Sequence, residues 1–204
     1  MNVLRNFRFA AIASLVSVAA LLAGCSIAVD KNKTGNDKNV KIDTPLGGLH
    51  VTSDSTTAAD VGLPVYPGAK LSTKDDKDGK DSADIHLGFG DWQFRLKVVK
   101  YQTPDPQDEV LAFYKKALGR YGDVIQCTGH NAVGSPAVTS EGLTCDDSGK
   151  SHQVNLDMGQ SLKAGSKHHQ HIVGIEKTDG PGTVFSLVEI DLPIGSDDGK
   201  AESN

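Results

Sequence analysis

Seven histidines give this 204-residue chain its clearest potential for metal chemistry, and three of them stand close together as His168, His169 and His171. In a β-strand, residues two apart point to the same face, so the imidazoles of His169 and His171 could bind one divalent metal ion. A closed zinc site takes about four ligands, and His152 or Asp157 on a neighbouring strand could supply others. The competing interpretation is a polar, exposed strand start near a turn, with no cofactor bound.

Patterns typical of nucleophilic catalysis are absent from the sequence. It contains neither Gly-x-Ser-x-Gly nor Ser-x-x-Lys, and its acidic residues are scattered instead of forming an evident catalytic pair. A site assembled from distant positions stays compatible with the sequence. We therefore name no catalytic residues and expect a binding or structural module more than an enzyme.

The first 25 residues have the chemistry of an export signal. Arg5 and Arg8 precede an apolar run over residues 9–22, which is too short to span a bilayer comfortably. The run ends in Leu22-Ala23-Gly24-Cys25, and this sequence resembles the lipobox of bacterial lipoproteins at every position.

That resemblance implies removal of residues 1–24 and acylation of Cys25, both on its thiol and on the new N-terminus. Several acyl chains hold a protein at a membrane far more firmly than one chain does. We therefore expect the membrane as a partner, with the protein anchored in the cell envelope. Because Ser26 follows the cysteine, the resemblance implies the outer membrane, facing the periplasm, in a Gram-negative cell. The competing interpretation is an ordinary secretory signal with an incidental cysteine.

The net charge of the chain limits the kinds of partner that it can be expected to bind. Without residues 1–24, the chain keeps 19 basic and 26 acidic residues, a net charge of −7 that argues against nucleic acid as a partner. A protein partner in the envelope is compatible with this composition.

Cys127 and Cys145 remain as an even pair in an exported chain, which predicts a disulfide. Two buried free thiols are the alternative.

The polar composition of residues 25–39 predicts a flexible tether, and the similar composition of residues 195–204 predicts a disordered tail. Residues 40–194 then form a single domain with one core. Apolar alternation predicts two hairpins, one over residues 40–52 and one over residues 83–101 with its turn near residues 90–91.

One amphipathic helix of about fifteen residues is predicted after the second hairpin. Asp105 is expected to cap it, with Pro106 as its first helical residue and Gly119 or Gly122 available to end it. Two prolines predict an extended connection over residues 63–69, packed through Val65 and Tyr66. Most of the eleven aromatic residues are expected in the core.

Further strands are predicted over residues 124–127, 143–145, 153–158, 171–176 and 183–191. The fold class is therefore α+β, with a largely antiparallel sheet of about seven or eight strands and one main amphipathic helix.

A second resemblance rests on three segments: Gly62-Leu63-Pro64-Val65-Tyr66-Pro67-Gly68-Ala69, Tyr101-Gln102-Thr103, and residues 110–118, which read Val-Leu-Ala-Phe-Tyr-Lys-Lys-Ala-Leu. Together they look like a group of uncharacterised bacterial exported proteins, over roughly residues 40–190. This resemblance implies an extended Pro-Gly segment packed near a helix, and it implies no activity.

Overall fold

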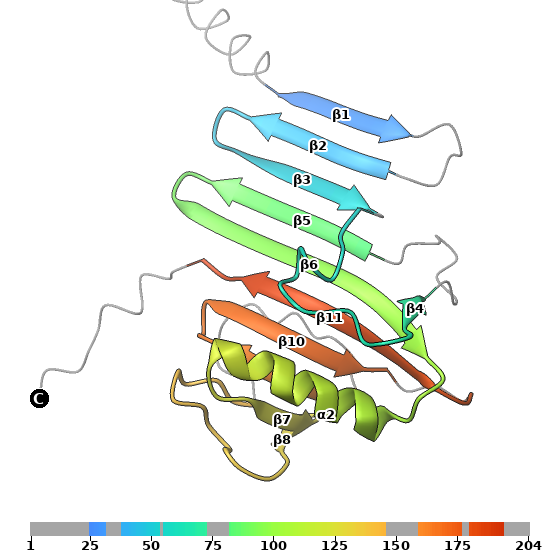
Figure 1. The fold of residues 1–204 in the computed structure, drawn as a ribbon. Helices are drawn as coiled ribbons and strands as arrows, with labels where there is room; N and C mark the ends of the chain where they lie inside the picture. Colours follow the sequence, from blue (N-terminus) through green and yellow to red (C-terminus); the bar gives the residue numbers. More distant parts are fainter. Residues whose placement is uncertain are drawn as a thin grey trace, which may run out of the picture.

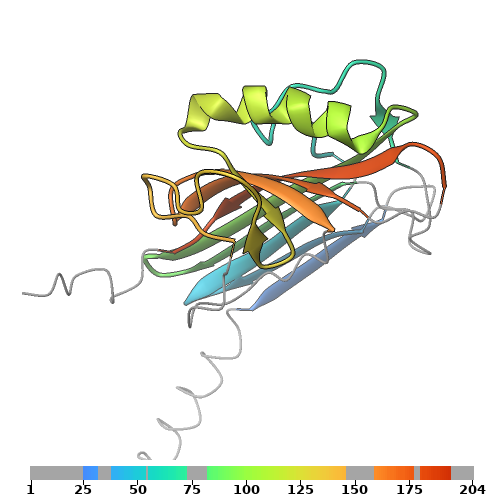
Figure 2. The same ribbon diagram turned by 90° about the horizontal axis from the view of Figure 1, so that it is seen from below.

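The computed structural model describes residues 25–31, 38–53, 55–72, 82–145, 159–176 and 180–193. They form one 11-stranded antiparallel sheet in the order β1-β2-β3-β5-β6-β11-β10-β9-β7-β8, and β4 also pairs with β6 (Figure 1). One face of this sheet carries the helix α2 (Figure 2).

The strands are β1 (Ser26–Lys31), β2 (Lys38–Thr44), β3 (Gly47–Ser53), β4 (Lys70–Leu71), β5 (Ser82–Phe89), β6 (Trp92–Thr103), β7 (Ile125–Thr128), β8 (Asn131–Ala132), β9 (Gln160–Gly165), β10 (His169–Ile175) and β11 (Thr183–Asp191). The helices are α2 (Gln107–Leu118) and the short 3-10 helix η1 (Gly119–Tyr121).

The predicted α+β class with an antiparallel sheet is confirmed, but the count of seven or eight strands is wrong. The sequence patterns missed β1, β4, β8 and β9. Three of these are short or lie near a sheet edge, and β9 contains Lys163 and Gly165, which hide its alternation. Residues 143–145 form no strand, and residues 153–158 lie outside the described part of the chain.

The expected flexible tether is also wrong for residues 26–31, because β1 pairs along its whole length with β2. Ile27 and Val29 lie opposite Ile42 and Val40 on one face, which is the period-two alternation of a strand. Residues 32–37 and the predicted tail over residues 195–204 lie outside the described residues.

Both predicted hairpins are present in the sheet. Residues 45–46 join β2 to β3, and the hydroxyl of Thr44 donates to the carbonyl of Gly47 at 2.7 Å. Residues 90–91 join β5 to β6, where Gly90 has a φ of +59° that glycine adopts without strain.

Helix α2 begins at Gln107, and Pro106 takes the N-cap position, so the prediction that Asp105 caps the helix is wrong. The cap position carries no side-chain hydrogen bond, and the Asp105 carbonyl instead accepts from the Thr183 hydroxyl at 2.7 Å. Asp108 and Glu109 lie in the first turn, where their negative charges interact favourably with the helix dipole.

Among the described residues, no helix has the length and apolarity required to cross a membrane.

The main core lies between the sheet and a layer made of α2 and residues 55–72 (Figure 2). Tyr66 is buried there as predicted, with its ring 5.2 Å from that of Phe113, whereas Val65 is 47% exposed and is not the expected anchor. The buried residues of this core are Ala58, Val61, Leu63, Tyr66, Val99, Tyr101, Val110, Leu111, Tyr114, Leu118, Leu162, Ala164, Val173, Ile175, Phe185 and Leu187. Trp92 is 41% exposed and Phe89 is 53% exposed, so these two aromatics lie outside it.

The structure contains the predicted disulfide between Cys127 on β7 and Cys145. Their Cα atoms lie 5.5 Å apart, and both cysteines are buried beside Ile125 and Leu143 in a small second cluster. The bond therefore fastens residues 143–145, which form no strand, to one edge of the sheet.

Candidate metal centre

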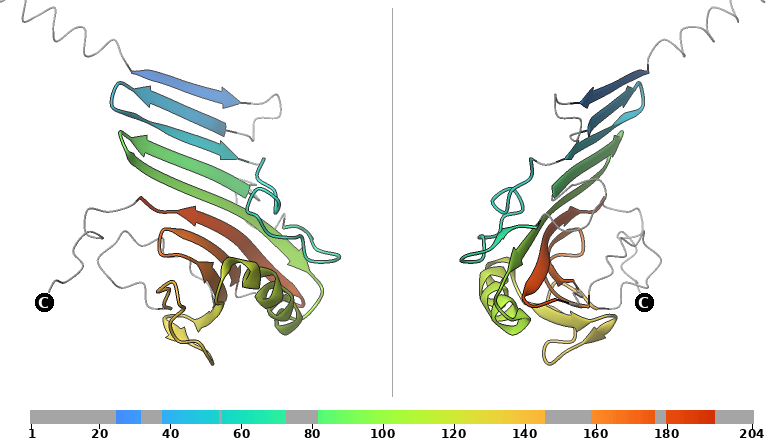
Figure 3. Two further views of the ribbon diagram at one scale, coloured as in Figure 1. Left: turned by 60° about the vertical axis from the view of Figure 1, so that its left-hand side comes forward. Right: turned by 90° about the vertical axis from the view of Figure 1, so that its right-hand side faces the viewer.

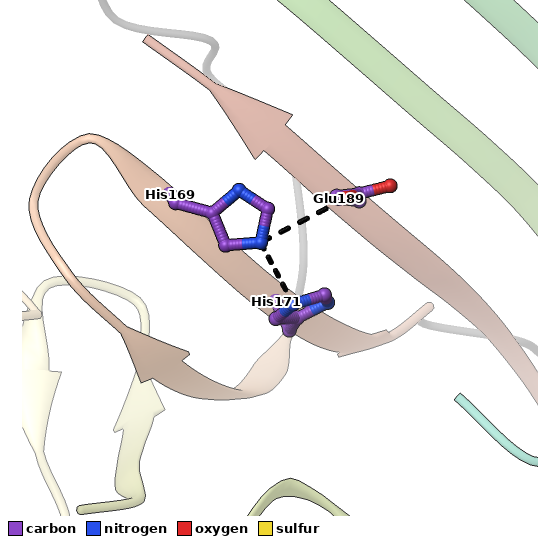
Figure 4. A group of neighbouring side chains, drawn as sticks. All are labelled: His169, His171 and Glu189. Atoms are coloured by element: carbon purple, nitrogen blue, oxygen red, sulfur yellow. Dashed lines mark hydrogen bonds and ion pairs between the residues drawn. The ribbon is translucent and has the colours of Figure 1, made fainter. Parts of the chain in front are cut away.

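The candidate site lies where β10 and β11 run side by side on the face that also carries α2. The antiparallel register places His171 directly opposite Glu189, and His169 directly opposite Asp191. Residues directly opposite one another in a sheet share a face, so all four side chains project to the same side. Figure 4 shows His169, His171 and Glu189 gathered at this point.

Three potential ligand atoms converge in this group. The Nε2 atoms of His169 and His171 are 3.2 Å apart, and His169 Nε2 is 3.8 Å from Glu189 Oε1. One nitrogen or oxygen from each of the three residues lies within 4.8 Å of the others. The predicted pairing of His169 and His171 on one face therefore occurs, and β11 adds a carboxylate.

The partners of the two Nδ1 atoms fix the imidazole tautomers. The carbonyl oxygen of Val61 can only accept, so His171 donates to it through Nδ1–H at 3.0 Å. The Asp191 carboxylate likewise accepts from Nδ1–H of His169. Each neutral ring then carries a lone pair on Nε2, and these lone pairs face one another. Either a proton on one ring or a metal ion bound by both nitrogens satisfies this arrangement.

His171 is held in a buried setting, with a side chain about 2% exposed. Burial, together with the neighbouring His169, lowers the pKa of His171 and so opposes the protonated state. Tyr121 stacks on its ring with centroids 3.6 Å apart, and the Tyr121 hydroxyl donates to the Gly62 carbonyl at 2.5 Å. Residues 61–62 and 121 thus hold His171 in one orientation.

Glu189 is shared between the histidines and a lysine. Its Oε2 accepts from Lys97 Nζ at 2.5 Å, and the same ammonium donates to the Asp60 carbonyl at 2.8 Å. These contacts orient the carboxylate, and its Oε1 remains on the histidine side. The Lys97 charge lowers the affinity of this site for a cation without occupying Oε1.

This donor set fits a zinc-type ion. Zn²⁺ binds imidazole nitrogen at about 2.0–2.1 Å, which places two tetrahedral ligand atoms roughly 3.3 Å apart. The observed 3.2 Å between the Nε2 atoms matches that spacing, and Glu189 Oε1 lies somewhat farther away, 3.8 Å from His169 Nε2. Two imidazoles and one carboxylate leave a fourth position for water or another ligand.

Sequence reasoning located the two histidines and missed the carboxylates. His152 and Asp157, considered as further ligands, lie outside the described residues. The signal for Glu189 was its place in the strand over residues 183–191, which is predicted from the sequence. Recognising it also required the β10–β11 register, which no local pattern provides.

Comparison of this chain with protein-family models, with curated proteins and with solved structures finds no match.

Proposed function

We propose that this protein is a lipid-anchored binding module of the cell envelope and that its ligand is a divalent transition-metal ion of the zinc class. The observation that carries the metal assignment is the pair of Nε2 lone pairs, 3.2 Å apart, with both Nδ1 atoms already hydrogen-bonded to acceptors. Such outer partners orient metal-ligating histidines and raise their basicity. His169, His171 and Glu189 are the proposed ligands, and Val61 and Asp191 are their supports.

The open fourth coordination position favours a site that binds and releases the metal ion over a structural site that holds it permanently. Structural zinc sites are closed by four protein ligands, whereas the part of the chain that the structure describes supplies three here. His169 has a side chain about 48% exposed, so an ion can reach the site from solvent. The function that follows is reversible capture of a metal ion at the envelope.

The metal assignment is tested by native mass spectrometry and by calorimetric titration with Zn²⁺ on the mature chain after treatment with a chelator. We expect one ion per chain, and we expect His169→Ala to weaken binding by at least tenfold. His169 is half-exposed, so its replacement should leave the fold intact, which circular dichroism verifies.

His86→Ala is the matched control. His86 lies in the same cross-strand row as His169 through Arg95 and Asp191, and its Nε2 contacts Gln93 Oε1 at 2.8 Å. Its loss should leave zinc binding unchanged. Equal affinities of the wild-type chain and His169→Ala would refute the metal assignment, as would an equal loss in the control.

The anchor assignment rests on the lipobox resemblance at Cys25, which is exposed and directly precedes β1. The mass of the mature protein isolated from membranes should exceed that of residues 25–204 by its acyl groups. Cys25→Ser should give an unprocessed or soluble protein, whereas Ser26→Ala should stay in the membrane fraction. A mature membrane-bound chain whose mass equals that of residues 25–204, without acyl groups, would contradict the anchor.

A further inference from the structure

The half of the sheet made of β1, β2, β3, β5 and the adjoining first part of β6 has two chemically different faces. One face carries the polar residues His50, His86 and Arg95. The other carries two apolar rows, each made of residues directly opposite one another. The first row is Ile27, Ile42, Leu49, Leu87 and Phe94; the second is Val29, Val40, Val51, Ile85 and Leu96.

The apolar face is on the side of the sheet away from α2. Val99 and Tyr101 of β6 pack into the main core, so Phe94, Leu96 and Val98, at alternate positions, face the other way. Helix α2 packs on β9 and β10, and Figure 3 shows β1, β2, β3 and β5 extending beyond it. Exposure of apolar side chains rises toward β1, where Ile27 is 70% and Val29 is 50% exposed.

Four of the exposed apolar side chains gather at one end of this half, and we call them the apolar end: Ile27, Leu46, Phe89 and Trp92. The register places Thr44, Gly47, Phe89 and Trp92 in one cross-strand row at this end, with Leu46 in the turn between Thr44 and Gly47. Ile27 lies on β1 opposite Ile42, two residues before Thr44. Leu46 is 83% exposed in the β2–β3 turn, and the rings of Phe89 and Trp92 are 6.0 Å apart.

Cys25 lies at this same end. Its neighbour Ser26 pairs with Asp43, two residues before the β2–β3 turn, and Figure 1 shows β1 beginning beside that turn. An acylated Cys25 would therefore hold the apolar end within a few residues of the bilayer, with no tether between them. That closeness gives the apolar end a high effective concentration at the lipid surface.

We propose that the apolar end docks into the lipid surface of the membrane that holds Cys25, which rests on the anchor proposed above. Tryptophan is enriched at the level of lipid headgroups, where its apolar ring and its polar N–H are both satisfied. Phenylalanine and leucine side chains are buried at the adjoining boundary with the acyl chains. The lipid surface is favoured over a second copy as the occupant, because Cys25 directly precedes β1 and its acyl groups would hold the apolar end beside the bilayer.

Trp92 is the one tryptophan of the chain and therefore reports on this docking directly. The assay adds vesicles of phosphatidylethanolamine and phosphatidylglycerol to residues 25–204 carrying Cys25→Ser, so that neither the apolar run over residues 9–22 nor an acyl anchor plays a part. We expect Trp92 emission to shift to shorter wavelength and brominated lipids to quench it. Leu46→Asp should weaken partitioning roughly tenfold or more, because burying one leucine-sized side chain is worth at least that much.

Val138→Asp is the matched control, since Val138 is 56% exposed in the region after β8, away from this end. It should partition like the parent chain. If Leu46→Asp does not fold by circular dichroism, Ile27→Asp on the edge strand replaces it. An unchanged Trp92 spectrum with vesicles would overturn the proposal, as would equal losses in Leu46→Asp and Val138→Asp.

The outcomes separate docking from anchoring. Acylated protein that attaches to vesicles without any change at Trp92 keeps the anchor and overturns docking. A chain with no acyl mass on Cys25 whose Trp92 still inserts would refute the anchor and support docking. A spectral shift that appears without vesicles and grows with protein concentration would show a second copy on this surface, and would overturn docking.

Discussion

Replacing Gly62 with alanine tests whether residues 61–62 hold the candidate metal centre in place. Gly62 has a φ of +75°, a left-handed conformation that costs alanine about 1–2 kcal/mol. An added Cβ would also lie 2.5 Å from the Tyr121 hydroxyl oxygen and 3.3 Å from His171 Cε1. The tyrosine must then move and lose its hydrogen bond to the Gly62 carbonyl, which is worth about 1 kcal/mol.

Gly68→Ala is the control that separates these two contributions. Its φ of +76° matches that of Gly62, and no atom of the described residues lies within 4 Å of the place that an added Cβ would take. Gly68→Ala should therefore lower the free energy of unfolding by about 1–2 kcal/mol through backbone strain alone. Gly62→Ala should lower it by about 2–3 kcal/mol, because the strain and the lost hydrogen bond add.

Urea denaturation of the chelated protein measures both values, and zinc titration of the same variants gives a second measurement. We expect Gly62→Ala to weaken zinc binding, because a displaced Tyr121 no longer orients the His171 ring. Gly68→Ala should bind zinc like the wild-type chain. Equal losses of stability in the two variants, or an unchanged zinc affinity in Gly62→Ala, would refute this account of the contacts around Gly62.

Two further predictions concern stability. Replacing Cys127 and Cys145 together with alanine should lower the free energy of unfolding by about 3 kcal/mol, because the bond closes an 18-residue separation in the unfolded chain; a loss below about 1 kcal/mol in urea denaturation would contradict this. Hydrogen bonds from the Thr57 hydroxyl and backbone N–H lower the pKa of Asp60. The ionised carboxylate therefore stabilises the fold above the unfolded pKa near 4, and this contribution disappears as the pH falls through the lower folded pKa. The stability difference between the wild-type chain and Asp60→Asn should accordingly shrink below about pH 4, and a constant difference down to about pH 2 would contradict the assignment.

Local patterns predicted the parts of this fold that local chemistry controls. The hairpin over residues 83–101 followed from apolar alternation on each side of the turn at residues 90–91, and β11 was predicted with its observed bounds. The helix was predicted from its buried face, but Asp105 was misassigned because the Asp105 carbonyl bonds to Thr183, 78 residues away in the chain. Residues 26–31 look like a tether in isolation, and their pairing with β2 makes them a strand.

The candidate site divides in the same way. The sequence by itself determined that His169 and His171 share a face, because the side-chain period of a strand is two residues. It also predicted the disulfide between Cys127 and Cys145, and it carries the lipobox resemblance on which the proposed anchor at Cys25 rests. The tertiary structure alone decided that Glu189 and Asp191 face those histidines, that Val61 and Tyr121 hold His171, and that Cys25 lies beside the apolar end. Those arrangements depend on strand order and register between distant segments, and a shift of one residue would turn every side chain of a strand to the opposite face.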